Sequence, residues 1–308
     1  PNSPAIHGMT GRSGTVLSYL EPDSVPNPCH VAYPCITMWT DAFRTWVERA
    51  TEVRHDIHKY PELGFEEKKT QATVMKWLTE LGYQPRAMAE TGVVADLRPE
   101  ASGRTIALRA DLDALPILEK TPLPYRSVHE GVSHKCGHDG HTAILLATAA
   151  ALMELRERIP GNVRLIFQPA EEGVRGGGAK VMVAEGVLEG VNEIYGLHNW
   201  PPFPKGHVRV RGGATMAEVT TLEVLFQGKG GHAAQPHATR DPIVAAAHFV
   251  SAAQTIISRN LSTHEPAVLS FGTFHAGTVH NVIPSRAELS GTLRTFSSEV
   301  TERVAERL

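Results

Sequence analysis

The sequence predicts an α/β domain with a largely parallel sheet, into which a smaller α+β domain is inserted. Two observations support this prediction. Between residues 41 and 217, short apolar runs alternate with segments of helical periodicity, as expected for strands that alternate with helices. After residue 217 the order becomes strand, helix, three strands and helix. We therefore expect three regions, at residues 1–38, 39–217 and 218–308.

The first region is expected to be a disordered leader. Residues 1–38 contain six prolines, with glycine and serine between them, and show neither helical nor strand periodicity. Helical spacing begins only near Asp41. The larger domain is expected to contain these elements in chain order: helices over 43–57 and 66–81, strands over 92–97 and 105–109, a helix over 141–155, a strand over 162–168, a helix over 178–185 and a strand over 193–197.

The smaller domain begins with an alternating strand over residues 220–227, which leads into a glycine-rich loop over 228–235. A long amphipathic helix follows over 241–258. Three strands and a last helix complete the pattern, at 267–274, 279–283, 287–295 and 297–308.

Composition and charge exclude several classes of protein. Hydrophobic residues make up 42% of the 308 residues, which is enough for a packed core. The net charge is −3 and no basic run contains interleaved aromatic residues, so we expect no nucleic-acid partner. The sequence has no apolar stretch near the roughly 18–20 residues that span a bilayer. With only three cysteines and no secretory signal, the chain is expected to be cytoplasmic.

Four polar segments stand at the ends of expected strands or at the start of an expected helix. They combine thiolate, imidazole and carboxylate groups, which are the ligand types that borderline divalent metals accept. The segments are Asp111-Leu-Asp113, Cys136-Gly-His138-Asp139, Glu171-Glu172 and Leu197-His198. Each alone has an ordinary interpretation, such as a buried cysteine, a turn or a solvated acidic face. Together they predict a metal site.

The adjacent carboxylates of Glu171 and Glu172 indicate that the two groups do different work. Side chains at neighbouring positions diverge, so one carboxylate can bind a metal while the other stays free beside a water molecule. The free carboxylate can then take a proton from that water and deliver it to a leaving amine. The pair therefore predicts hydrolytic chemistry.

Five longer motifs occur in order along residues 41–308. They are R-H-D-I-H-K-Y-P-E-L-G-F-E from Arg54, R-A-D-L-D-A-L-P from Arg109, C-G-H-D-G-H from Cys136, Q-P-A-E-E from Gln168 and G-H-A-A-Q-P-H from Gly231. These motifs resemble the aminoacylase/carboxypeptidase family of two-metal metallohydrolases. The branch that is most similar contains hippurate hydrolase, N-acyl-amino-acid amidohydrolase and auxin-amino-acid conjugate hydrolase.

The resemblance implies a phosphorylase/hydrolase-like catalytic domain with two divalent metal ions and an inserted lid that forms a homodimer. Glu171 would be the general base and acid, and Asp113 would orient a ligand, while the role of Asp111 beside it is open. The residues that would bind the metals are Cys136, His138, Glu172 and His198.

Three lid residues also match family positions. His232 would reach the site of the partner subunit and stabilise an oxyanion. Asn281 and Arg294 would hold the substrate, and an arginine fork suits a substrate carboxylate. The family pattern continues past the lid and supplies a last histidine ligand, so we expect the catalytic domain to be completed beyond Leu308. His58 is expected to be a packed or surface histidine and not a ligand.

We expect metal-dependent hydrolysis of the amide bond in N-acyl or aroyl amino acids, which releases a carboxylic acid and a free amino acid. One alternative is a dipeptidase or carboxypeptidase that uses the same site. The other is a fragment that only binds metal or dimerises. The cysteine favours zinc, cobalt or nickel, while the carboxylates admit manganese.

Overall fold

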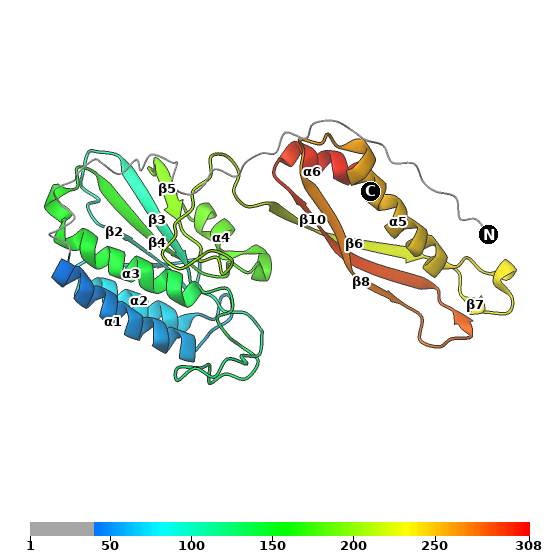
Figure 1. Ribbon diagram of the computed structural model, residues 1–308, viewed down its shortest axis with the longest axis horizontal. Coiled ribbons are helices and arrows are strands. Elements are labelled where there is room, and N and C mark those ends of the chain that lie inside the picture. Colours follow the sequence, from blue (N-terminus) through cyan, green and yellow to red (C-terminus); the bar gives the residue numbers. More distant parts are fainter. Residues whose placement is uncertain (1–39) are drawn as a thin grey trace, which may run out of the picture. The chain divides into compact units, whose positions relative to one another are not determined.

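The computed structural model describes residues 40–308 (Figure 1), so the predicted leader over residues 1–38 lies outside the described residues. The chain divides into two compact units, of which the first ends at Phe203 and the second begins at Pro204. Residues 204–217 contain no helix or strand. The expected boundary at residues 217 and 218 lies where this irregular segment ends.

The first unit is built on a five-stranded sheet with the strand order β1-β2-β4-β3-β5. Its strands are β1 (Arg86–Met88), β2 (Gly92–Asp96), β3 (Thr105–Asp111), β4 (Asn162–Gln168) and β5 (Glu193–Gly196). Its helices are α1 (Thr40–Lys59), α2 (Lys68–Glu80), α3 (His138–Glu154) and α4 (Gly178–Ala184), with short 3-10 turns at Arg156–Arg158 and Val174–Gly176.

The α/β class is confirmed, but the sheet is mixed and not mostly parallel. Strands β3, β4 and β5 are parallel, whereas β2 pairs antiparallel with both β4 and β1. The sequence pattern did not predict β1. Only residues 89–91 separate β1 from β2, and a parallel connection needs a crossover of a dozen residues or more, so this pair can only be antiparallel.

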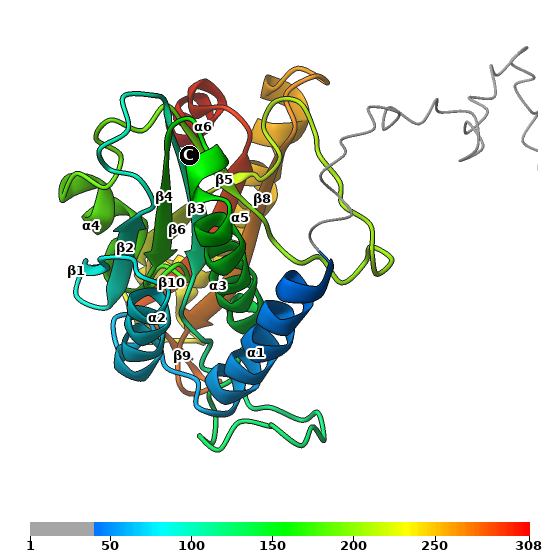
Figure 2. The same cartoon turned by 90° about the vertical axis from the view of Figure 1, so that its left-hand side faces the viewer.

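Apolar side chains fill both faces of the sheet. Val93, Leu165 and Phe167 face one core, which helices α1, α2 and α3 cover. The alternate residues Val94 and Ile166 face a second core, which α4 covers (Figure 2). Strands that are buried on both sides read as continuous apolar runs, which explains why the sequence identified β2 and β4 so readily.

The second unit consists of a three-stranded antiparallel sheet with the order β6-β10-β8. Its strands are β6 (Glu218–Gln227), β8 (Ala267–Ala276) and β10 (Arg286–Thr295). Helices α5 (Pro242–Asn260) and α6 (Ser298–Ala305) pack on the sheet. The predicted strand over 279–283 is reduced to β9 (Val282–Ile283), which pairs with β7 (Gly231–His232) inside the glycine-rich loop, and Pro236–Ala238 form a 3-10 turn.

Helix α5 begins as its sequence predicts. The Asp241 carboxylate accepts hydrogen bonds from the backbone N–H groups of Ile243 (2.8 Å) and Val244 (3.4 Å), and Pro242 occupies the first turn.

Within residues 40–308, none of the helices combines the length and the apolar character that a membrane crossing requires.

Replacing Leu146 with alanine should lower the free energy of unfolding by about 2–5 kcal/mol. Leu146 is 0% exposed on α3 and contacts the larger core, so its loss leaves a cavity. The matched control is Leu118→Ala, because Leu118 is 49% exposed in the same unit, and its cost should stay within about 0.5 kcal/mol. Chemical denaturation of both variants measures the loss of unfolding free energy. Equal losses in the two variants would contradict the placement of Leu146 in the core.

Candidate metal centre

The predicted site residues of the first unit meet at the carboxyl ends of the three parallel strands. Asp111 is the last residue of β3, and Glu171 and Glu172 follow β4 by three and four residues. His198 follows β5 by two residues. Because the carboxyl ends of parallel strands lie at one edge of the sheet, side chains far apart in the sequence converge here.

The amino-terminal end of α3 completes this edge, and Gly137 determines its geometry. Gly137 precedes the helix with φ 89°, and a Cβ on it would lie 2.5 Å from Oδ1 of Asn199. The left-handed conformation therefore favours glycine, and a larger residue would also have to displace the Asn199 side chain. The helix begins at His138 and not at His141 as expected, so these two histidines stand three residues apart on one helical face.

His138 lies at the centre of the site. Its Nδ1 is 2.9 Å from the backbone oxygen of Asp113, to which it can donate, and 3.2 Å from Asp113 Oδ1. Its Nε2 is buried and finds no hydrogen-bond partner among the described residues. The nearest carboxylate oxygens to Nε2 belong to Glu171 (3.7 Å), Asp111 (3.8 Å) and Glu172 (4.0 Å).

These separations fit a cation better than they fit direct hydrogen bonds. Two tetrahedral ligand atoms lie about 3.4 Å apart across one zinc-sized ion. The carboxylates of Asp113 and Asp111 also raise the pKa of His138, because together with other nearby acids they outweigh the lowering effect of burial. The negative electrostatic potential that favours a proton on this ring also favours a metal cation beside it.

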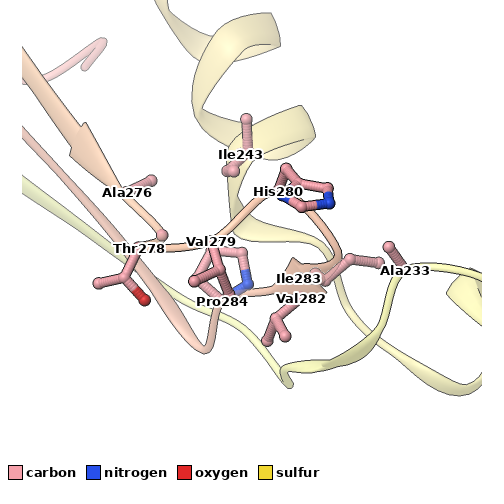
Figure 3. A pocket seen from close by; sticks show the side chains of 10 residues that line it. Ala233, Ile243, Ala276, Thr278, Val279, His280, Val282, Ile283 and Pro284 are labelled. Atoms are coloured by element: carbon pink, nitrogen blue, oxygen red, sulfur yellow. The ribbon is translucent and has the colours of Figure 1, made fainter.

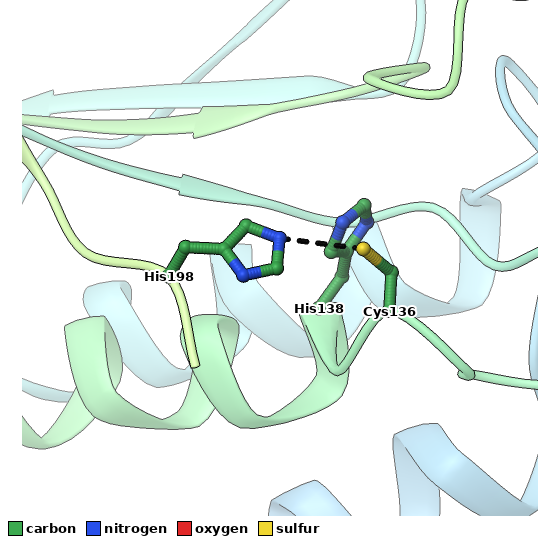
Figure 4. A group of neighbouring side chains, drawn as sticks. All are labelled: Cys136, His138 and His198. Atoms are coloured by element: carbon green, nitrogen blue, oxygen red, sulfur yellow. Dashed lines mark hydrogen bonds between the residues drawn. The ribbon is translucent and has the colours of Figure 1, made fainter. Parts of the chain in front are cut away.

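Three sets of side chains in the described chain bring potential ligand atoms within 4.8 Å of one another, and all three share His138. All four predicted metal-binding residues are found in these sets. In one, Cys136 Sγ lies 3.3 Å from Nε2 of His198, and Figure 4 shows both side chains beside His138. The three sets are Cys136-His138-His198, His138-Glu171-Glu172 and Asp111-His138-His141.

The third set is better explained as support than as a ligand set. His141 donates from Nδ1 to Asp111 Oδ1 (2.7 Å), and its Nε2 accepts from the backbone N–H of Asn199 (3.0 Å). Arg109 donates to the other oxygen of Asp111 at 2.6 Å. Burial would raise the pKa of Asp111, but His141 and the nearby cations lower it to about 2. The sequence left Asp111 and His141 without roles, although their places in the D-L-D and C-G-H-D-G-H motifs marked both.

The charges in the site repel one another unless a cation is present. Burial, followed by the nearby carboxylates of Glu172 and Glu171, raises the pKa of the Cys136 thiol to about 12. Burial and the neighbouring Glu171 also raise the pKa of Glu172. Asp113 connects the acidic pair to His138, because its Oδ2 accepts from the backbone N–H of Glu172 at 3.0 Å.

A second polar network lies behind the first turn of α3. Asp139 is 1% exposed and contacts His58 Nδ1 and Arg54 Nε, both at 3.0 Å. The other ring nitrogen of His58 lies 3.2 Å from Glu119, which Lys135 also contacts. His58 is therefore a packed histidine that links two carboxylates, and none of the three ligand sets includes it.

The predicted lid residues all belong to the second unit. His232 and Asn281 lie close together, since β7 pairs with β9 and the N–H of Ala233 donates to the Asn281 carbonyl (3.0 Å). A hollow of about 450 Å³ opens beside them, lined by residues 276–280 and 282–284 with Ala233 and Ile243 (Figure 3). Arg294 lies near the far end of β10, where the strand from Arg286 onward spans about 26 Å. The structure does not bring Arg294 to Asn281 within this unit.

Comparisons with known proteins give the same picture. Residues 107–297 match the model of peptidase family M20/M25/M40. The chain is 47% identical to N-acetyl-L-cysteine deacetylase of Bacillus subtilis over 83% of its own length and 61% of that protein, and 40% identical to thermostable carboxypeptidase 1 of Saccharolobus solfataricus over 83% and 65%.

A solved structure agrees with these relatives. A dinuclear metal-binding peptidase of the M20 family from Bacillus subtilis superposes with a TM-score of 0.72 at 39% identity, covering 86% of this chain and 68% of the other. The chain thus spans about two thirds of the length of the relatives that it matches. The strand-end motifs, the fold and the sequence matches agree, and the chain belongs to peptidase family M20/M25/M40.

Proposed function

We propose that the protein hydrolyses the amide bond of N-acyl amino acids with the help of two divalent metal ions. The observation that carries this proposal is the acidic pair Glu171-Glu172 beside the unpartnered Nε2 of His138. The deacetylase among the relatives acts, by its name, on an N-acetyl amino acid, and the solved relative is named for two metals. Cys136, His138, Glu172 and His198 are the proposed ligands.

Glu171 and Asp113 have different roles in the proposed reaction. Metal ions at this site would act as Lewis acids on the amide carbonyl and lower the pKa of a water molecule. Glu171 takes the proton of the attacking water and then donates it to the leaving nitrogen. Its side chain is 39% exposed, compared with 26% for Glu172, and can therefore reach water and substrate. Asp113 holds the His138 ring in place through Nδ1.

The lid residues keep roles that follow from the family resemblance. We propose a homodimer in which His232 of the partner subunit stabilises the oxyanion, while Asn281 and Arg294 bind the substrate. His232 and Asn281 lie close together in the second unit, which supports the proposal that both act on one substrate molecule.

Zinc and manganese are the proposed metals, with cobalt or nickel as alternatives, and elemental analysis of the purified protein distinguishes them. The low cysteine content supports a cytoplasmic location.

A carboxypeptidase activity is the second candidate, because one relative at 40% identity bears that name. A panel of N-acetyl and N-benzoyl amino acids, including hippurate, tested beside dipeptides separates the two. We expect kcat/KM to be highest for the acyl amino acids. Faster cleavage of the peptides would favour the carboxypeptidase.

Replacing Glu171 with glutamine should abolish turnover and leave the metal content unchanged, because the amide cannot accept the proton. The measurement is kcat together with metal stoichiometry on the full-length protein, with an expected loss of at least about 100-fold. Glu172→Gln is the matched comparison and should lose metal. Normal turnover of the Glu171 variant would exclude this residue as the base.

Metal binding should release a proton from Cys136. Its raised pKa, about 12, keeps the thiol protonated at neutral pH, whereas a metal binds the thiolate. The affinity should therefore rise between pH 6 and pH 8, by about tenfold per unit for one proton. Calorimetric titration in buffers of different ionisation enthalpy counts the protons. Cys136→Ser should release one fewer proton than the unchanged protein, and an identical count in the two would contradict the assignment.

A further inference from the structure

A carboxylate outside the three ligand sets occupies a position that the proposed chemistry does not explain. Glu67 is 0% exposed, and burial raises its pKa. One of its oxygens accepts from the backbone N–H of Ala170 at 2.8 Å, and the other accepts from the Thr91 hydroxyl at 2.5 Å. Because burying a carboxyl group is unfavourable, its presence here calls for a specific role.

The residue that Glu67 binds is a strained one. Ala170 has φ 48°, a left-handed conformation that residues with a Cβ adopt at a cost. It stands between the end of β4 and the Glu171-Glu172 pair, so its conformation sets the direction in which the pair leaves the sheet. Its N–H is held by Glu67, and its carbonyl accepts from Gly178 at 3.0 Å.

The same segment supports Ala170 from a second direction. A Cβ on Gly64 would lie 3.0 Å from both Cα and Cβ of Ala170, so the two backbones are in close contact. The segment also reaches the other acidic loop, because Leu63 bridges to Ala114 and the N–H of Ala114 donates to the Glu62 carbonyl at 2.8 Å. Residues 62–67 therefore contact both the loop that contains Asp113 and the turn that precedes Glu171.

Capping of helix α2 does not account for Glu67. Glu67 stands at the cap position, yet in the described chain its side chain makes no capping hydrogen bond. Glu62 caps the helix instead, with its carboxylate accepting from the N–H groups of Lys69 and Thr70, both at 2.9 Å. The segment carries three acidic residues, and two of them thus have separate roles: Glu62 caps the helix, and Glu67 accepts the backbone N–H of Ala170.

We propose that Glu67 is a positioning residue that holds the turn at Ala170 and so aims Glu171 and Glu172 at the metal site. The proposal rests on the proposed function of that pair. Glu67 belongs to none of the three ligand sets of the described residues, and it acts by accepting the Ala170 N–H. Without that acceptor the turn relaxes, and the two carboxylates move relative to His138.

The test uses the full-length protein loaded with Co²⁺, whose visible absorption spectrum reports ligand geometry. Glu67→Met keeps the size of the side chain but removes the acceptor. We expect a changed spectrum, a Co²⁺ affinity lower by about 10–100-fold and a kcat lower by about 100-fold, with a much smaller change in KM. Glu67→Gln keeps a carbonyl oxygen for the Ala170 N–H and should restore most of each property.

The matched control is Glu62→Met, which removes the cap of the same helix. It should lower thermal stability and leave the spectrum and kcat unchanged. Gly64→Ala provides a second approach if Glu67→Met does not fold, because it displaces Ala170 while Glu67 remains, and it should alter the spectrum in the same direction.

Two results would overturn the proposal. One is a wild-type spectrum and kcat in folded Glu67→Met, or a wild-type spectrum in Gly64→Ala if Glu67→Met does not fold. The other is equal impairment of Glu67→Gln and Glu67→Met, which would show that accepting the Ala170 N–H is not what matters. If the unchanged protein binds Co²⁺ but hydrolyses no acyl amino acid, the proposed function fails while the spectra still decide the role of Glu67.

Discussion

Four carboxylates lie around one buried imidazole, and they repel one another electrostatically. The structure of the first unit around this site depends on how that repulsion is offset. Asp111, Asp113, Glu171 and Glu172 all lie near His138 in a partly desolvated edge of the sheet. Such a concentration of negative charge is unfavourable without cations or hydrogen-bond donors. Arg109, the backbone N–H of Glu172 and the amino-terminal end of α3 supply part of the compensation. The negative charge that these groups leave uncompensated favours the binding of divalent metal ions.

The surrounding polar groups hold the ligand atoms in fixed positions. On one side, His141 connects Asp111 to the backbone of Asn199, which is the neighbour of His198. On another, Arg54 and His58 bind Asp139 within the first turn of α3, beside His138. The residue that follows each proposed ligand histidine is thus hydrogen-bonded to a distant segment. This arrangement limits the movement of the imidazoles, which a two-metal site requires.

The family relation narrows the chemistry without fixing the substrate. A deacetylase and a carboxypeptidase both match this chain at 40% identity or more, and both names describe hydrolysis of an amide bond next to an amino acid. Under the proposed function, the groups at the sheet edge would act on either kind of bond. The other proposed residues belong to the second unit, where His232 and Asn281 lie together and Arg294 lies at the other end of its strand.

The sequence by itself determined the α/β class and most strand positions, because apolar runs are visible locally, and its four polar segments predicted a metal site. The four proposed metal-binding residues within these segments followed from the family resemblance. It also predicted the smaller unit with its long helix. Tertiary structure alone decided the antiparallel edge of the sheet, the start of α3 at His138 and the roles of Asp111, His141 and Glu67. These depend on contacts between distant segments, such as Gly137 with Asn199 and Glu67 with Ala170. Hydrogen bonds and close backbone contacts of this kind leave no periodic trace in the sequence.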